Sequence, residues 1–132
     1  MCLAAGCIAP QTVVMSDVDS RGWSDPVTVA FRNDDSLSQR TLSVVLRYNG
    51  DFRCTALPLD ITVSLPDAGQ FTEHVVVHPA HSVSPAAVVS AAESMTYRRS
   101  SVLRQRGYYL FTISPAWEVR GVEAVGIDIK NE

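Results

Sequence analysis

The stretch that decides the fold of this chain is Gly107-Tyr-Tyr-Leu-Phe-Thr-Ile-Ser-Pro115, followed after a short break by Val119-Arg-Gly-Val-Glu-Ala-Val-Gly-Ile-Asp-Ile-Lys130. Aromatic and β-branched residues dominate both runs, which is typical of β-strands. The first run is apolar on both faces, which predicts a strand in the middle of a sheet. In the second run, every other residue from Val125 to Ile129 is a large aliphatic, which predicts one dry face and one wetter face. We expect the two strands to pair antiparallel as the spine of a sheet.

Working outward, apolar residues recur at every second position in residues 27–31, 42–48, 57–65 and 71–77. No helix produces this period over nine residues, and turn signals such as Asn49-Gly50 and Pro66-Asp-Ala-Gly69 separate the runs. Short strands spaced about ten residues apart are typical of an antiparallel sandwich. We therefore predict an all-β fold, a single antiparallel, jelly-roll-like β-sandwich over residues 12–132.

One segment breaks this pattern. Ser84 can cap a helix, Pro85 suits the first helical position, and the residues up to Met95 are rich in alanine. These features predict one short helix of two or three turns near residues 85–95.

The composition sets limits on the class of protein. A length of 132 residues is enough for one domain, and a net charge of −3 does not suit a nucleic-acid-binding domain, which normally carries a basic face. No run of about 18 apolar residues is present to span a bilayer as a helix.

The N-terminal sequence Leu3-Ala-Ala-Gly-Cys7 resembles the lipobox at which the signal peptides of bacterial lipoproteins are cut. We expect Cys7 to be the lipid-bearing first residue of the mature protein and residues 1–11 to be the remnant of a signal peptide plus a tether. The basic and apolar regions of a signal peptide are missing here, so we expect the true start to lie upstream of Met1. Cys54 is then the single cysteine left with a thiol, which leaves no intrachain disulfide.

Several dispersed segments together carry a family resemblance. They are Gly22-Trp23, Val27-Thr-Val-Ala-Phe31, Leu42-Ser-Val-Val-Leu-Arg47-Tyr-Asn49, Phe52, Leu57-Pro-Leu59, Leu65-Pro-Asp-Ala-Gly69, and the closing run from Gly107 through Arg120-Gly-Val to Val125-Gly-Ile-Asp-Ile129. With these segments, the chain resembles the GldH family of gliding-motility lipoproteins of the Bacteroidetes. The arginine that precedes the final strand in that family corresponds to Arg120.

The resemblance implies a membrane-anchored lipoprotein of the cell envelope, facing the periplasm or the cell surface. Its partners would be the membrane, through the lipid anchor, and other envelope lipoproteins or components of the motility and secretion machinery. The chain departs from the family in its alanine-rich segment, in the arginines Arg98, Arg99, Arg104 and Arg106, and in Trp117-Glu118.

The sequence contains no set of residues that forms a nucleophile, base or metal centre, so we expect neither catalysis nor a cofactor. His74 and His78 lie roughly 13 Å apart if both are on one strand, too far to share a metal ion, although His78 and His81 could approach across Pro79. We expect no metal site.

Four residues are candidates for an interaction surface: Trp23, Trp117, Arg98 and Arg99. The two arginines could meet anionic lipid headgroups or an acidic partner. The tryptophans suggest an alternative function, a surface glycan-binding module in which they stack on sugar rings, although core packing is the more common role of such residues.

Overall fold

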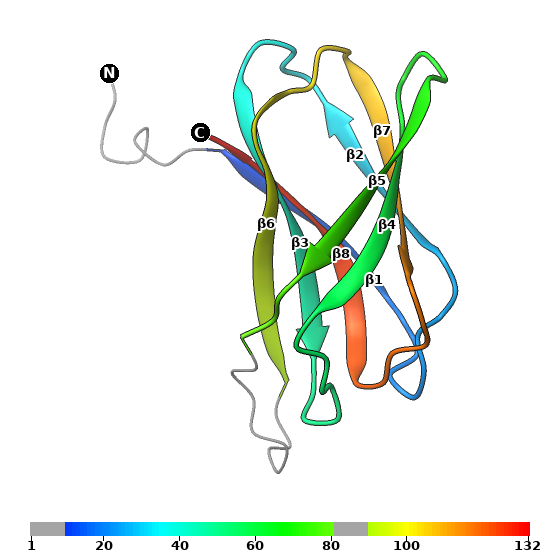
Figure 1. Ribbon diagram of the computed structural model, residues 1–132. Helices are drawn as coiled ribbons and strands as arrows, with labels where there is room; N and C mark the ends of the chain where they lie inside the picture. Colours follow the sequence, from blue (N-terminus) through cyan, green and yellow to red (C-terminus); the bar gives the residue numbers. More distant parts are fainter. Residues whose placement is uncertain (1–9, 81–89) are drawn as a thin grey trace.

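The computed structural model describes residues 10–80 and 90–132 as a β-sandwich of two four-stranded sheets (Figure 1). The strands are β1 (Gln11–Asp17), β2 (Val27–Asn33), β3 (Gln39–Tyr48), β4 (Leu57–Ser64), β5 (Gln70–Val77), β6 (Ala91–Val102), β7 (Gly107–Pro115) and β8 (Val122–Asn131).

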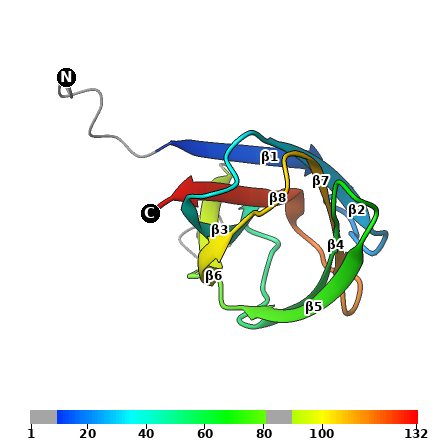
Figure 2. The same cartoon turned by 90° about the horizontal axis from the view of Figure 1, so that it is seen from above.

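One sheet has the order β1-β8-β3-β6 and the other β2-β7-β4-β5, with every pairing antiparallel. Two interlocked Greek keys in this order make an eight-stranded jelly roll, so the predicted fold class is confirmed. Viewed from above, β1 lies beside β2 at one edge of the sandwich, and β5 approaches β6 at the other edge (Figure 2).

The predicted terminal hairpin is wrong. β7 pairs with β2 and β4, whereas β8 pairs with β1 and β3, so the two strands lie in opposite sheets. Each strand is central in its own sheet, as its apolar character predicts. One apolar face of each strand points into the core, where burial stabilises it. Tyr108 and Leu110 on the other face of β7 remain exposed. Asn49-Gly50 likewise leads from one sheet to the other and does not close a hairpin.

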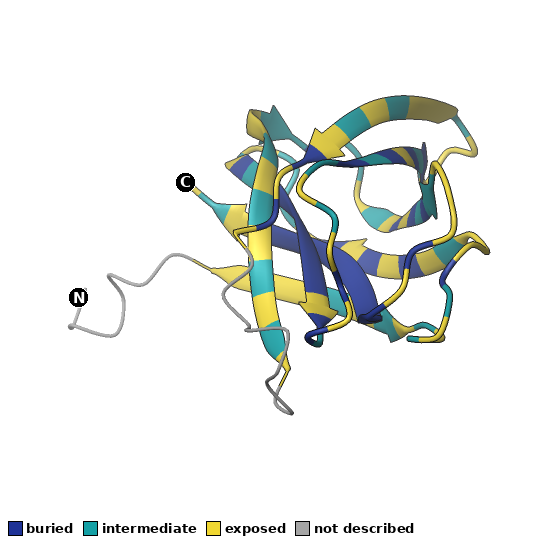
Figure 3. Cartoon of the chain, turned by 60° about the horizontal axis from the view of Figure 1, so that its bottom comes forward, coloured by how far each residue is buried: buried dark blue, intermediate teal, exposed yellow. Residues whose placement is uncertain are grey.

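The predicted helix is also corrected. Residues 85–89 lie outside the described part of the chain, but residues 91–95 are the start of strand β6. Half-buried and exposed residues alternate along β6 from Ala91 to Arg98, as the banding in Figure 3 shows. Pairing with β3 gives these backbone groups their partners, and that tertiary interaction outweighs the helix propensity of alanine. No helix in the described residues is long and apolar enough to cross a membrane.

The core lies between the two sheets and is made of aliphatic and aromatic side chains from all four central strands. The largest fully buried side chains include Tyr48, Phe111, Leu46, Leu57, Ile61, Ile113 and Ile127. The loop that follows β1 adds Trp23, which forms an isolated bridge with Val119. The sandwich thus carries one continuous core, as expected for a single domain.

Candidate binding cleft

A cleft of about 280 Å³ opens between β5 and β6, at the edge where the two sheets diverge. Both sheets and the β6–β7 loop contribute to its wall. The lining residues are Leu42, Val63, Leu65, Phe71, Glu73, Arg98, Ser101, Val102, Leu103, Arg104, Gln105, Tyr109 and Phe111. The volume is close to the lower end of the range for small-molecule sites, roughly 300–1,000 Å³.

The interior of the cleft is apolar. Val63, Tyr109 and Phe111 are almost fully buried side chains of the core, and they form its floor. Phe71 lies at the mouth and is 44% exposed, although it comes from the inward-facing side of β5. An exposed aromatic side chain beside a buried apolar floor is suited to contact an apolar group that enters from outside.

An ion pair spans the mouth and joins the two edge strands. Arg98 of β6 binds Glu73 of β5, with its Nε 3.1 Å from Oε2. An irregularity in β6 sets this geometry, because Ser43 pairs with Thr96 while Leu42 pairs with Arg98, which leaves Tyr97 as an extra residue. Bulges of this kind re-aim a side chain. Arg98 thereby reaches across to β5.

Tyr97 lies beside this ion pair and packs against the core. Burial raises the pKa of its phenol, and the nearby charge of Glu73 raises it further, while Arg98 acts in the opposite direction. The hydroxyl is buried and has no hydrogen-bond partner among the described residues. Tyr97 therefore stays protonated in the folded protein at pH values where a free phenol ionises.

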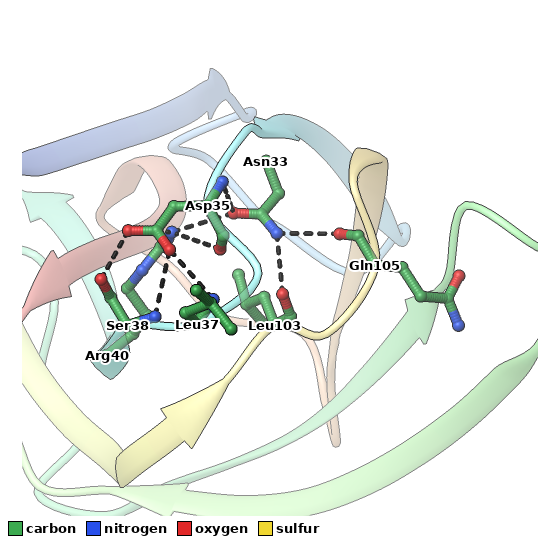
Figure 4. A network of polar contacts seen from close by, with 7 residues as sticks. All are labelled: Asn33, Asp35, Leu37, Ser38, Arg40, Leu103 and Gln105. Carbon is green, nitrogen blue, oxygen red and sulfur yellow. Dashed lines mark hydrogen bonds and ion pairs between the residues drawn. The ribbon is translucent and has the colours of Figure 1, made fainter.

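A polar network fixes the loop that forms the end wall of the cleft (Figure 4). Asn33, fully buried at the end of β2, donates from Nδ2 to the carbonyl oxygens of Leu103 at 2.9 Å and Gln105 at 2.8 Å. Its Oδ1 accepts from Nη2 of Arg40 at 2.9 Å, and the same Nη2 donates to the carbonyl of Asp35. The network ties the β2–β3 loop to the β6–β7 loop, so the position of Leu103 in the wall depends on Asn33.

Asp35 has an unusual acidity within this network. Its carboxylate accepts hydrogen bonds from the Ser38 hydroxyl and from the backbone N–H groups of Leu37 and Ser38, and these lower its pKa to about 2. The β2–β3 loop therefore keeps its negative charge through the whole neutral and mildly acidic range.

The side chain of Gln105 closes the same end of the cleft. Its Oε1 accepts from the backbone N–H of Asp67 at 3.0 Å, and its Nε2 donates to the Asp67 carboxylate at 3.0 Å. The β4–β5 turn is thus tied to the β6–β7 loop, and the cleft remains open only along the gap between β5 and β6.

The structure separates the four residues that we predicted as an interaction surface. Arg98 lines the cleft, whereas Arg99 points to the outer face of its sheet. Trp23 is only 2% exposed and donates from Nε1 to the carbonyl of Asp25 at 2.9 Å, so it is a core residue and cannot stack on a ligand. Trp117, 51% exposed, lies in the β7–β8 loop. Cys7 lies outside the described residues.

Two of the three histidines, His74 and His78, lie in the described part of the chain. His74 contacts the Asp60 carboxylate at 2.5 Å on the outer face of its sheet, and His81 lies outside the described residues. Within residues 10–80 and 90–132, no three His, Cys, Asp or Glu side chains come close enough to hold a metal ion.

The sequence analysis missed Phe71, Glu73 and Tyr97 as parts of a site. A signal was present for Glu73, because it shares a strand face with Phe71, Val75 and Val77. A charge on an otherwise apolar face is a known feature of edge strands. Tyr97 had no such signal, since it stands between the alanine-rich segment and a polar, basic run in which no strand was predicted.

The cleft offers an apolar recess flanked by a guanidinium and a carboxylate, an arrangement suited to binding. Comparison with models of known protein families and with curated proteins finds no match to this chain.

Proposed function

We propose that this chain is a non-catalytic lipoprotein of the bacterial cell envelope, anchored by acylation of Cys7, that acts by binding other envelope proteins of the gliding-motility or secretion machinery. A single acyl chain gives marginal membrane binding, whereas several chains on one cysteine hold a protein stably. In this proposal the sandwich presents a binding surface and carries out no reaction.

The observation that carries the proposal is the convergence of the segments on which the resemblance to the GldH family rests. Trp23 and Val119 exchange backbone hydrogen bonds of 2.8 and 2.9 Å. Gly121 has a φ of 88°, and a Cβ there would lie 2.3 Å from the backbone nitrogen of Phe52. Asn49 donates its N–H to the carbonyl of Gly121 at 2.9 Å. Positions of the resemblance that are far apart in the sequence therefore meet in one structural unit, as expected if they serve a common fold.

We assign the partner contact to the cleft. Within the described residues, β5 pairs only with β4 and β6 only with β3, so each keeps one unpaired edge. An extended segment can add to such an edge through main-chain hydrogen bonds while alternate side chains enter a pocket. The occupant is thus an extended segment of an envelope protein that places an apolar side chain beside Phe71.

The test is site-specific photo-crosslinking in the native envelope. A photoreactive phenylalanine analogue replaces Phe71 in one variant and Val76 in a matched control. Val76 lies on the same strand and is similarly exposed, at 52%, but it faces away from the cleft.

The proposal predicts an adduct from position 71, absent from position 76, whose partner peptide maps to one extended segment of an envelope protein. The adduct should be lost when Cys7→Ala releases the chain from the membrane. Equal adducts at both positions, or none at position 71, would contradict the proposal.

A further inference from the structure

A second recess, of about 390 Å³, lies on the outer face of the β1-β8-β3-β6 sheet, away from the core. Its floor is made of the small side chains that β3 and β8 direct outward, among them Ser43 and Asp128, both only 6% exposed. Longer side chains from the edge strands, Gln11 of β1 and Arg99 of β6, form its rim. We refer to this recess as the polar groove.

Asp128 is the unusual residue of the polar groove. Its Oδ2 accepts from Nε2 of Gln11 at 2.7 Å and from the hydroxyl of Ser94 at 3.5 Å. Its Oδ1 is buried and has no hydrogen-bond partner among the described residues. A buried carboxylate oxygen that lacks a donor is unfavourable, and it calls for an explanation such as an absent ligand.

The surroundings of Asp128 are rich in hydroxyl groups. Ser43 is its register partner on β3, and the Ser43 hydroxyl lies 3.0 Å from that of Thr96. A hydroxyl both donates and accepts hydrogen bonds, so Ser43 and Thr96 can each bind a ligand hydroxyl as donor or as acceptor. The exposed side-chain amide of Gln11 donates a hydrogen bond to Asp128, and a ligand hydroxyl would donate to the carboxylate from the same position.

An apolar strip borders the same carboxylate on the other side. Val13 of β1 pairs in register with Asp128 and is 46% exposed, and Met15 pairs with Gly126. A Cβ on Gly126 would lie 2.0 Å from the carbonyl oxygen of Val14 and 2.7 Å from the Cα and Cγ of Met15, so the glycine lets the β1 backbone lie close to β8. The groove itself is lined by polar side chains, and this apolar strip lies beside it on β1.

We propose that the polar groove binds a neutral carbohydrate, with Asp128 accepting hydrogen bonds from adjacent sugar hydroxyls and with Val13 and Met15 contacting the C–H face of the ring. A pyranose has the same division, with hydroxyls at its edge and apolar C–H faces. Among the described residues that line the groove, Asp128 is the single carboxylate and Arg99 and Lys130 are positive, which disfavours a divalent cation as the occupant.

This inference goes beyond the proposed partner contact and does not depend on it. The groove lies on an outer sheet face and the cleft lies between the sheets. Glycan binding in the groove and partner binding in the cleft are therefore tested by separate experiments. The tryptophans are not involved, because Trp23 is buried and Trp117 is not among the residues that line the groove.

The test applies the full chain carrying Cys7→Ala to an array of neutral and acidic oligosaccharides built from glucose, mannose, galactose and N-acetylglucosamine. The best-bound glycan is then titrated calorimetrically against Asp128→Asn. The matched control is Asp60→Asn, which makes the same change at an exposed carboxylate on the opposite sheet.

We expect a neutral glycan to bind, Asp128→Asn to weaken its binding at least about tenfold, the effect of losing one charge-assisted hydrogen bond, and Asp60→Asn to leave it unchanged. Chelation with EDTA should have no effect. The proposal is overturned if no array glycan binds, if acidic glycans are preferred, if EDTA abolishes binding, or if the two variants behave alike.

Discussion

Replacing Asn33 with alanine tests whether one buried amide holds the end wall of the cleft. The change removes both donors to the carbonyls of Leu103 and Gln105 and the acceptor for Arg40. Arg40 keeps its bond to the carbonyl of Asp35, so the main losses are the Leu103 carbonyl and one contact of a guanidinium that is only 4% exposed. At about 1–3 kcal/mol for each of these two losses, the free energy of unfolding should fall by roughly 2–6 kcal/mol.

The assay is guanidinium denaturation followed by the fluorescence of Trp23, which is buried in the native state. All variants carry Cys7→Ala, which removes the proposed acylation site. Asn33→Asp keeps an acceptor for Arg40 but sets a carboxylate against two carbonyl oxygens, so it should be at least as destabilising as alanine. Asn131→Ala, a half-buried amide at the end of β8, is the control and should cost less than about 0.5 kcal/mol.

A loss below 1 kcal/mol for Asn33→Ala, or a wild-type stability for Asn33→Asp, would refute the reasoning. Either result would mean that the β6–β7 loop is held by other contacts, and the network would then have no bearing on the cleft.

Three other changes have expected outcomes. Gly121→Ala should lower the free energy of unfolding by more than about 2 kcal/mol, because the φ of Gly121 is 88° and a Cβ there would meet the Phe52 backbone. In the control, Gly69→Ala, the Cβ would meet only flexible side chains, so thermal or chemical unfolding should show less than half of that loss. Tyr97→Phe removes a hydroxyl that has no partner, so it should leave the protein as stable or more stable by up to about 1 kcal/mol at pH 7. Because burial raises the folded pKa of Tyr97, the wild type should also lose stability as the pH rises above about 10, where the unfolded phenol ionises, and the phenylalanine variant should lack this loss. Ser38→Ala should raise the pKa of Asp35 from about 2 toward 3.8 in an NMR titration, because the Ser38 hydroxyl is the largest cause of its depression; the stability linked to Asp35 is complete above pH 3.8 and disappears as the pH falls through about 2.

The period-two patterns predicted the strands well because a sandwich buries one face of each strand. Val27–Asn33, Leu57–Ser64 and Gln70–Val77 begin and end within one or two residues of the predicted runs. Pairing partners were harder to predict, because apolar alternation tells which face is buried but not which sheet a strand joins. The last two strands illustrate this, since each satisfies its pattern in a different sheet.

The error at residues 91–95 has a related cause. Alanine and glutamate favour a helix locally. Pairing with the edge of β3 overrides this preference, and that pairing is a tertiary feature. With that strand misassigned, the cleft between β5 and β6 could not be foreseen, although Arg98 was identified as a candidate contact. Asp128 was placed on the wetter face of its strand, but its burial depends on side chains from β1 and β6 that no local pattern reveals.

The central claim is that the sandwich works from a lipid anchor on Cys7, and metabolic labelling with radioactive palmitate of the chain expressed from its own chromosomal gene tests it most directly. We predict that the wild type and a Cys54→Ala control are labelled and sediment with the membranes, whereas Cys7→Ala is unlabelled and released. Equal labelling of the wild type and Cys7→Ala, or no labelling of either, would contradict the account.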